Sequence, residues 1–294
     1  MRWGVFLLGL WLFSCSSGKE EPLCPCRQYG KPVEVTLQGY DGDVMEPFLS
    51  RDGKYLFFNS LNDGVTTSLY YALRLDDTLF RFAGEVKGVN HEPPHLEAVP
   101  SMDREGNFYY ITTHDYPDQL KNLMCGHFSG GEVTGVHPVE GDFYTLQVGW
   151  LIMGAEIGAE GEYLFYTKAR FREGPVPEEA FLGIARRKDT LFLQEKDAGQ
   201  VLATLNDPSY LVYGVAVADD KKEIFFTRLK KGGTATEICM AVRSSLAEPF
   251  GEPCVLVSGD MAEAPALGPD GVTLYFHRKD PGDGKYHLFL MRRH

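Results

Sequence analysis

One pattern of apolar and polar positions occurs five times along the chain. Each copy starts with a short strand of small and apolar residues, passes through a tight polar turn, and ends with a strand rich in Tyr, Phe and Leu that stops near an Asn, Thr or His. The copies are EPFLSRDGKYLFFNS from Glu46, EAVPSMDREGNFYYITT from Glu97, GAEIGAEGEYLFYTKA from Gly154, YGVAVADDKKEIFFTR from Tyr213 and EAPALGPDGVTLYFHR from Glu263. Short apolar runs on either side of a polar turn predict a β-hairpin rather than a helix.

The turns of the five copies carry related dipeptides: Asp52-Gly53, Glu105-Gly106, Glu160-Gly161, Asp220-Lys221 and Asp270-Gly271. Asp-Gly between two apolar runs is a strong hairpin signal, because Gly takes a positive φ without a steric clash. Equivalent turn residues are spaced by roughly fifty to sixty residues, at the long end of the range for propeller blades. The spacing therefore favours a propeller over a helical solenoid.

Each repeat has room for two further strands, so that it makes one four-stranded blade. They are SLYYALRL and TLFRFAGEV in the first repeat, AFLGIARR and TLFLQEK in the third, and EICMAVRS and PCVLVSG in the fourth. The fifth repeat ends with its third strand, YHLFLMRRH. A further segment that alternates like a strand, PVEVTLQG from Pro32 to Gly39, precedes the first repeat.

The sequence therefore predicts an all-β fold, a single β-propeller of five four-stranded blades. We expect the N-terminal strand to pair with the C-terminal blade and close the ring, which removes the exposed edges that an open sheet must protect. A six-bladed propeller is the alternative, if the long stretch from Phe171 to Tyr213 contains a degenerate unit.

The repeat resembles the TolB-like, WD40-like β-propeller repeat of bacterial envelope proteins, whose core contains Glu-Pro, then Ser-Pro-Asp-Gly, then an aromatic strand. Glu46-Pro47, Ser50 and Asp52-Gly53 match it best, followed by Ala264-Pro265 with Pro269-Asp270-Gly271. The third and fourth repeats lack the Pro and the Asp-Gly turn. The resemblance implies a propeller of the envelope and no particular activity, because one fold hosts many functions.

The N-terminus has the pattern of a secretory signal. Arg2 precedes an apolar run from Trp3 to Phe13, which is shorter than the roughly 20 residues of a membrane span. Leu12-Phe13-Ser14-Cys15 resembles a bacterial lipobox, in which the cysteine is lipidated after cleavage. We expect a signal peptide over 1–14, a lipidated Cys15 and linker over 15–30, and the propeller over 31–294. An ordinary cleaved signal with an incidental cysteine is the alternative.

The expected location is the outer membrane of a bacterial envelope, either periplasmic or exposed at the surface, with only the lipid in the bilayer. The formal net charge of −12 argues against nucleic acid or an anionic bilayer as the main partner, because both select basic surfaces. We expect a monomer without a cofactor, whose partner is an envelope protein, a peptide or a glycan.

Six cysteines in an exported chain predict disulfides. With Cys15 reserved for lipid, five remain and one of them stays unpaired within the chain. Cys239 and Cys254 flank a predicted hairpin and could form a disulfide across it. Cys24 and Cys26 are too close in sequence for an easy mutual bridge.

The segment His91-Glu92-Pro93-Pro94-His95 has the letters of a zinc peptidase motif. That chemistry needs both histidines on one face of a helix. The two prolines lack N–H donors and disfavour the α conformation of the preceding residue, so the segment is expected to be extended. A peptidase site is therefore excluded, although His91 and His95 stay the candidate ligands if a metal is bound.

In a propeller, the connections between blades lie on the face of the disc that usually binds ligands. We expect His91, Glu92 and His95 to meet side chains from the start of the first blade there, with Glu97 and the rim residue His114 close by. The predicted binding residues are Asp41, Asp43, Glu46, His91, Glu92, His95, Glu97 and His114. A solvated, proline-rigidified connection is the plainer interpretation of the same loop.

The innermost strands also carry Glu46, Glu97, Glu156 and Glu263, and glycosidases need two carboxylates about 5 to 9.5 Å apart. The repeat itself accounts for a glutamate near the start of each inner strand, so a structural role is preferred. The expected function is a non-enzymatic module that binds a protein, peptide or glycan. A carbohydrate-active enzyme, either a glycosidase or a metal-dependent lyase, with its site at the axial mouth is the alternative.

Overall fold

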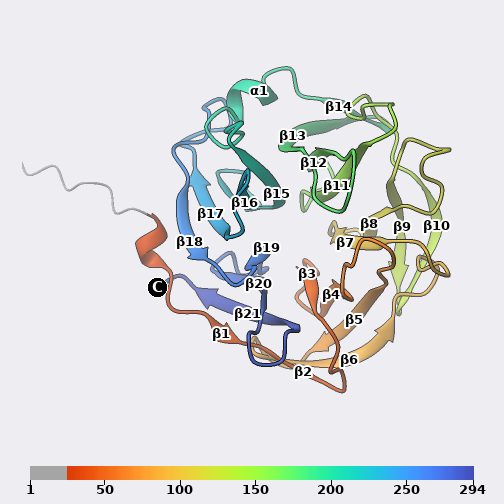
Figure 1. Ribbon diagram of the computed structural model, residues 1–294, viewed down its shortest axis with the longest axis vertical. Coiled ribbons are helices and arrows are strands. Elements are labelled where there is room, and N and C mark those ends of the chain that lie inside the picture. The colour runs from red at the N-terminus through yellow and green to blue at the C-terminus, as the bar shows by residue number, and fades with distance from the viewer. Residues whose placement is uncertain (1–24) are drawn as a thin grey trace, which may run out of the picture.

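A computed structural model describes residues 25–294 of the chain. The signal, Cys15 and Cys24 lie outside these residues. Five sheets are arranged around a central axis, as Figure 1 shows, and each contributes one blade of a β-propeller. The prediction of an all-β, five-bladed fold is confirmed.

The strands of each blade follow one another from the axis outward. Blade one contains β3 (Met45–Leu49), β4 (Tyr55–Asn59), β5 (Leu69–Arg74) and β6 (Leu79–Glu85). Blade two contains β7 (Glu97–Met102), β8 (Asn107–Thr112), β9 (Leu123–Ser129) and β10 (Glu132–Pro138). Blade three contains β11 (Trp150–Ile157), β12 (Tyr163–Arg170), β13 (Glu179–Lys188) and β14 (Leu191–Gln194).

The remaining blades follow the same order. Blade four contains β15 (Tyr210–Val217), β16 (Glu223–Lys230), β17 (Thr236–Val242) and β18 (Cys254–Ser258). Blade five contains β19 (Glu263–Leu267), β20 (Thr273–Lys279), β21 (Tyr286–Arg292) and β1 (Val33–Glu34). The stretch from 171 to 213, where a sixth blade was the alternative, instead holds β13, β14 and the short helix α1 (Ala198–Val201).

The N-terminal segment closes the ring as predicted. Val33 pairs with Leu290 in the antiparallel β1–β21 ladder, and the outer edge of blade five is thereby completed. The chain then continues into β2 (Thr36–Gln38), which pairs in parallel with β6 of blade one, Thr36 opposite Leu79. One short segment therefore bridges the first and last blades on the outside of the disc.

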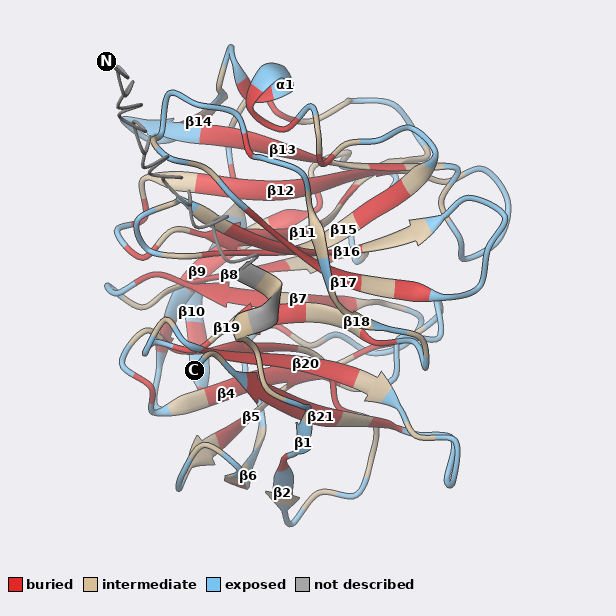
Figure 2. Cartoon of the chain, turned by 90° about the vertical axis from the view of Figure 1, so that its left-hand side faces the viewer, coloured by how far each residue is buried: buried red, intermediate tan, exposed pale blue. Residues whose placement is uncertain are grey.

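The core lies between the blades, where wide apolar faces pack against each other. Between blades one and two, for example, the ring of Phe57 contacts that of Phe108 edge to face, with centroids 5.0 Å apart. Figure 2 shows the buried residues concentrated along the strands and the exposed ones in the loops. Such aromatic contacts bury large areas and account for the Tyr- and Phe-rich second strand of every repeat.

The five polar turns after the innermost strands are equivalent, as their dipeptides predicted. The turn residues Gly53, Gly106, Gly161, Lys221 and Gly271 all have a positive φ, between 60° and 83°. Gly adopts this conformation without a Cβ clash. In blade four Lys221 adopts it with a side chain, and the hairpin forms there as well.

A second repeated feature joins consecutive blades close to the axis. In three blades a polar residue in the second half of the second strand accepts a hydrogen bond from the backbone of a bulge in the next blade's first strand. The pairs are Asn59 Oδ1 with Val99 N at 3.3 Å, Thr227 Oγ1 with Ala264 N at 2.9 Å, and His277 Nδ1 with Glu46 N at 2.9 Å. The three bulge residues have φ angles of 53°, 52° and 51° in that order. In these three blades the contact explains the Asn, Thr or His that follows the aromatic residues of the second strand.

The predicted Cys239–Cys254 bridge is wrong. Cys254 is bonded to Cys26 across 228 positions of sequence, with Cα atoms 6.1 Å apart. In the β17–β18 ladder Cys239 pairs with Val255 and Cys254 with Met240, so the two cysteines are offset by one residue and their side chains lie on opposite faces. Within residues 25–294, Cys125 and Cys239 are buried without a disulfide partner.

No helix within the described part of the chain is long and apolar enough to span a membrane.

Candidate functional site

The connections between blades lie on one face of the disc, here called the connecting face, and the five polar turns lie on the other, the turn face. The segment from His91 to His95 belongs to the connection between β6 and β7 and contains no helix. The expectation that it is not a helical peptidase motif is confirmed. His91 and His114 are exposed there, while His95 is partly buried.

The structure brings three imidazole rings together on this face. His91 stacks on His114 with ring centroids 3.8 Å apart, and His95 lies edge-on to His114 at 4.7 Å. His114 comes from the loop after β8. The pairing of Glu97 with Thr112 in the β7–β8 hairpin brings that loop beside the connection that carries His91.

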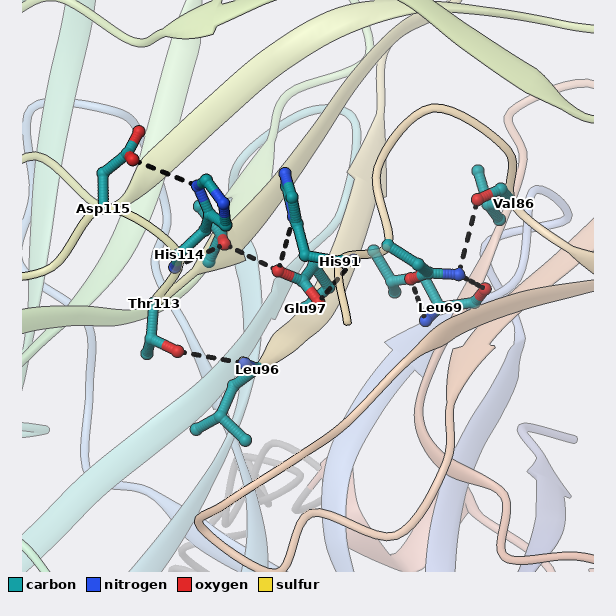
Figure 3. Close-up of polar contacts among 10 residues, drawn as sticks. Leu69, Val86, His91, Leu96, Glu97, Thr113, His114 and Asp115 are labelled. Atoms are coloured by element: carbon teal, nitrogen blue, oxygen red, sulfur yellow. Dashed lines mark hydrogen bonds and ion pairs between the residues drawn. The ribbon is translucent and has the colours of Figure 1, made fainter. Parts of the chain in front are cut away.

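Glu97 holds His91 in place from below (Figure 3). Its Oε1 lies 3.0 Å from Nδ1 of His91 and accepts a hydrogen bond of 2.8 Å from the hydroxyl of Thr112. Glu97 is fully buried, at 0% exposure. It therefore orients the imidazole and does not itself face a ligand.

A second carboxylate anchors the neighbouring ring. Oδ1 of Asp115 lies 3.0 Å from Nδ1 of His114, and both side chains are about half exposed. Figure 3 shows the two imidazoles between their carboxylate partners. Two adjacent rings are thus each fixed through the same ring nitrogen.

Glu46 occupies the axis, away from the three histidines. The residue is partly exposed, yet its Oε2 is buried and has no hydrogen-bond partner. Burial raises the pKa of Glu46 to about 7, and the carboxylate of Glu263 acts in the same direction. A positive charge on His277 would oppose the shift, but Nδ1 of that ring accepts the N–H of Glu46 and so carries no proton.

Blades four and five provide part of the surroundings of Glu46. Nε2 of His277 lies 3.6 Å from Oε2 of Glu263, and Oε1 of Glu263 accepts a hydrogen bond of 2.9 Å from the hydroxyl of Tyr213. Burial raises the pKa of Tyr213 well above its usual value, and Glu263 adds to the shift. The phenol therefore stays protonated and donates to the carboxylate.

The other predicted residues do not join either group. The backbone carbonyl of Asp41 accepts from Nζ of Lys285, and Oδ1 of Asp43 accepts from the N–H of Tyr286. Both aspartates therefore lie against the β20–β21 hairpin of blade five, and the expected meeting with His91 and His95 does not occur. Glu92 is exposed on the connection.

The four inner-strand glutamates are not equivalent, which corrects the interpretation that the repeat accounts for them. Glu263 is the last paired residue before its bulge and Glu97 lies one position earlier. Glu46 lies within its bulge and Glu156 lies beyond its own. A bulge changes which side chains face inward, and the four glutamates lie at different positions relative to it, so their carboxylates reach different surroundings.

Glu156 lies near the turn face and forms an ion pair with Arg51. Nη2 of Arg51 is 2.5 Å from Oε1 of Glu156, and both side chains are 9% exposed. Burial raises the pKa of Glu156 although Arg51 opposes the shift. This carboxylate is therefore a structural partner and not part of the connecting face.

A cavity in the structure lies away from the predicted binding residues. A cavity of about 440 Å³ lies on the turn face between blades one and two, and none of the predicted binding residues lines it. Across residues 25–294, no three His, Cys, Asp or Glu side chains are arranged to hold a metal ion.

Sequence reasoning missed His277 and Tyr213. His277 lies in the second strand of its repeat, at the position where Asn59 and Thr227 contact the next blade. The recurring polar residue at that position was visible in the sequence and could have placed His277 beside the axis. Tyr213 carries no such signal, because its partner Glu263 is set by the packing of blade four against blade five.

No protein-family model matches the chain, and no curated protein matches it. Its fold is similar to solved structures. A thermostable family-43 glycoside hydrolase aligns with a TM-score of 0.55 and 11% identity over 88% of this chain and 91% of that one. An endo-arabinase from Bacteroides thetaiotaomicron VPI-5482 aligns with a TM-score of 0.53 and 13% identity over 89% and 97%.

TolB from Acinetobacter baumannii also matches, with a TM-score of 0.46 and 12% identity over 85% of this chain and 54% of that one. At these identities the likeness extends to the fold alone. The matches include both TolB structures and glycoside hydrolases. The activity of this chain therefore has to be argued from its own site.

Proposed function

We propose that this chain is an exported, lipid-anchored propeller of the bacterial envelope that binds a glycan at its connecting face without cleaving it. The Cys26–Cys254 disulfide supports export, because such bonds persist in oxidising compartments. The signal pattern and Cys15 support the lipid anchor.

The observation that carries this proposal is the set of fixed polar groups on the connecting face. Carboxylates hold the rings of His91 and His114 in one orientation, and the partly exposed Glu46 stands at the axis. Sugars are recognised by a few directed hydrogen bonds to groups that do not have to be ordered on binding.

Binding without cleavage is preferred because the inner-strand carboxylates are already engaged. Glu97 is fully buried against His91 and Thr112, and Glu156 is paired with Arg51 near the other face. Glu263 accepts the hydroxyl of Tyr213. A glycosidase needs two carboxyl groups that both reach the substrate.

A carbohydrate-active enzyme is the second candidate, and Glu46 is the observation in its favour. A carboxyl group with a pKa of about 7 suits a general acid at neutral pH. Glu263, which contributes to that shift, would then serve as the partner carboxylate. In this case Glu46 and Glu263 are both required for turnover.

One experiment separates the two functions. The purified protein is titrated calorimetrically with a panel of neutral and acidic oligosaccharides, and the mixtures are then analysed for cleavage products. We expect binding without products, weakened at least tenfold by Glu46→Gln. The exposed Glu105 on the turn face provides the control variant Glu105→Gln, which should bind normally.

Cleavage products that disappear in both Glu46→Gln and Glu263→Gln would establish the enzyme instead. If no oligosaccharide binds and none is cleaved, the glycan proposal fails and the ligand is a peptide or protein.

A further inference from the structure

The three histidines of the connecting face have an arrangement that glycan binding does not require. His91, His95 and His114 come from two separate loops, yet their ring centroids lie within 3.8 to 6.1 Å of one another. The side chain of His91 is 37% exposed and that of His114 is 40% exposed. Their rings are therefore accessible to a solute.

The protonation of the two stacked rings follows from their partners. A carboxylate only accepts hydrogen bonds, so Nδ1 of His91, 3.0 Å from Glu97, carries the proton of the neutral ring. The same reasoning places the proton of His114 on Nδ1, 3.0 Å from Asp115. Nε2 of each neutral ring then has a free lone pair. Figure 3 shows this nitrogen of His91 directed away from Glu97.

A metal-binding histidine commonly donates one ring N–H to a carboxylate and binds the metal through its other ring nitrogen. His91 and His114 have this arrangement, with Nδ1 at a carboxylate and Nε2 free. The carboxylate fixes the tautomer and the ring direction and makes the free nitrogen a better donor. Imidazole nitrogen suits Zn²⁺, Cu²⁺ and Ni²⁺, whereas Mg²⁺ and Ca²⁺ select oxygen ligands. The net charge of −12 also favours the approach of a cation.

We propose that His91 and His114 form a two-imidazole site for a transition-metal ion of the Zn²⁺ class on the connecting face. Zn–N bonds of about 2.0–2.1 Å with tetrahedral angles require the two nitrogens to lie roughly 3.3 Å apart. A shared ion lies in the plane of each ring. The two rings, whose planes are now only 22° apart, therefore have to turn out of their stacked arrangement before both Nε2 atoms face one ion.

The remaining coordination positions are filled from outside the pair. His95 lies 4.7 Å from His114, ring to ring, and becomes a third ligand when its side chain turns. No three donors within residues 25–294 are arranged for a metal in the present conformation, and the positions that His95 does not take are filled by water or by a ligand. Structural zinc sites, in contrast, are closed by four protein ligands.

The alternative is that the two carboxylates fix the histidines only to hold the loops. In that case the rings would pin the β6–β7 connection and the loop after β8, and no metal would bind. This alternative predicts the same contacts but a different response to metal, so that a titration decides between them.

The test is a calorimetric titration of the metal-free protein with ZnCl₂ in a non-coordinating buffer. We expect one Zn²⁺ per chain, with His91→Ala and His114→Ala each weakening the affinity at least tenfold. Asp115→Asn should weaken it by about 10- to 100-fold, as losses of an outer carboxylate do. The control is His137→Ala, which removes an exposed histidine of β10 whose Nδ1 lies 2.8 Å from the Gly135 carbonyl oxygen, and it should leave the affinity unchanged.

Co²⁺ provides an independent readout, because its visible absorption reports nitrogen ligation directly. Absence of Zn²⁺ binding, or binding that survives in the His91→Ala/His114→Ala double variant, overturns the proposal. If His91→Ala fails to fold, His114→Ala decides, since that side chain lies on an exposed loop. The glycan titration is run with a chelator present, so its success or failure is independent of the metal result.

Discussion

The backbone N–H of Glu46 donates a hydrogen bond of 2.9 Å to Nδ1 of His277, although the two residues are 231 positions apart in sequence. Glu46 belongs to the first strand of blade one and His277 to the second strand of blade five. The contact closes the ring at the axis, just as the pairing of β1 with β21 closes it at the outer edge. The first and last blades are therefore connected both near the axis and at the outer edge of the disc.

We expect His277→Ala to destabilise the fold and His277→Asn to restore most of the loss. Alanine leaves the N–H of Glu46 without an acceptor near the axis, which costs about 1–3 kcal/mol, and the void left by the ring adds to this. Asparagine makes the equivalent contact in blade one, where Asn59 accepts the N–H of Val99. Urea unfolding of the three proteins measures the difference. Equal losses in both variants would mean that ring packing, and not the hydrogen bond, stabilises this position.

Arg51 connects blade one to blade three on the turn face. Besides its ion pair with Glu156, Nη2 donates to the carbonyl of Ile157 at 2.7 Å and Nε to that of Met102 at 3.3 Å. Arg51→Ala leaves a buried carboxylate unpaired and is expected to cost about 3–5 kcal/mol in thermal or urea unfolding. The double variant Arg51→Met with Glu156→Gln should recover most of that loss, because no buried charge is left. A double variant as unstable as Arg51→Ala would contradict this account.

The Cys26–Cys254 disulfide attaches the N-terminal segment to the outer strand of blade four. It closes a loop that contains nearly the whole propeller, so its loss is expected to lower the free energy of unfolding by about 2–5 kcal/mol. Thermal unfolding with and without reductant measures the effect. Reductant should produce no further change in Cys254→Ser, which serves as the control. An unchanged melting temperature of the wild type in reductant would show that the bridge does not stabilise the fold.

The blade count and the closure of the ring could be predicted because each feature recurs. The aromatic second strands and the turns at Gly53, Gly106, Gly161 and Gly271 repeat the same local physics, and even Lys221 follows it. A pattern that is repeated five times is insensitive to the departure of one copy. The fold could therefore be predicted from the repeated pattern alone.

The site was harder to predict from the sequence, because offsets of a single residue determine which side chains meet. Glu46, Glu97 and Glu263 each begin a copy of the repeat, yet each lies at a different position relative to the bulge of its strand. One residue of register also separates Cys239 from Cys254. Bulges and offsets of this size leave no trace in apolar periodicity, which has a period of two in any strand.

The proximity of His91 and His114 could be predicted from the sequence only in part. It follows from the β7–β8 hairpin, in which Glu97 pairs with Thr112. Once that register is known, the flanking loops must be neighbours. The hairpin itself was predicted, so the approach of the two histidines could have been deduced from it. Their stacking and the role of Asp115 could not, because both depend on side-chain orientations.

The stability of the protein should depend on pH through Glu46. Its pKa is about 7 in the folded chain, against an ordinary value of 4.5 for a glutamate, so between these values the folded state keeps a proton that the unfolded chain has lost. Stability contributed by the neutral carboxyl is therefore present at low pH and is lost as the pH rises from about 4.5 to about 7. Glu46→Gln keeps the side chain neutral throughout.

We accordingly expect Glu46→Gln to be more stable than the wild type at pH 8, by about 3 kcal/mol, since one pKa unit corresponds to about 1.4 kcal/mol. At pH 4 the two proteins should unfold alike. Urea unfolding at both pH values measures the difference, and groups unchanged by the substitution cancel from it. Glu105→Gln, on the exposed turn face, should show no such pH-dependent difference. If the gain of Glu46→Gln were the same at pH 4 and pH 8, the ionisation of Glu46 would not be its cause, and the case for Glu46 as a general acid would lose its support.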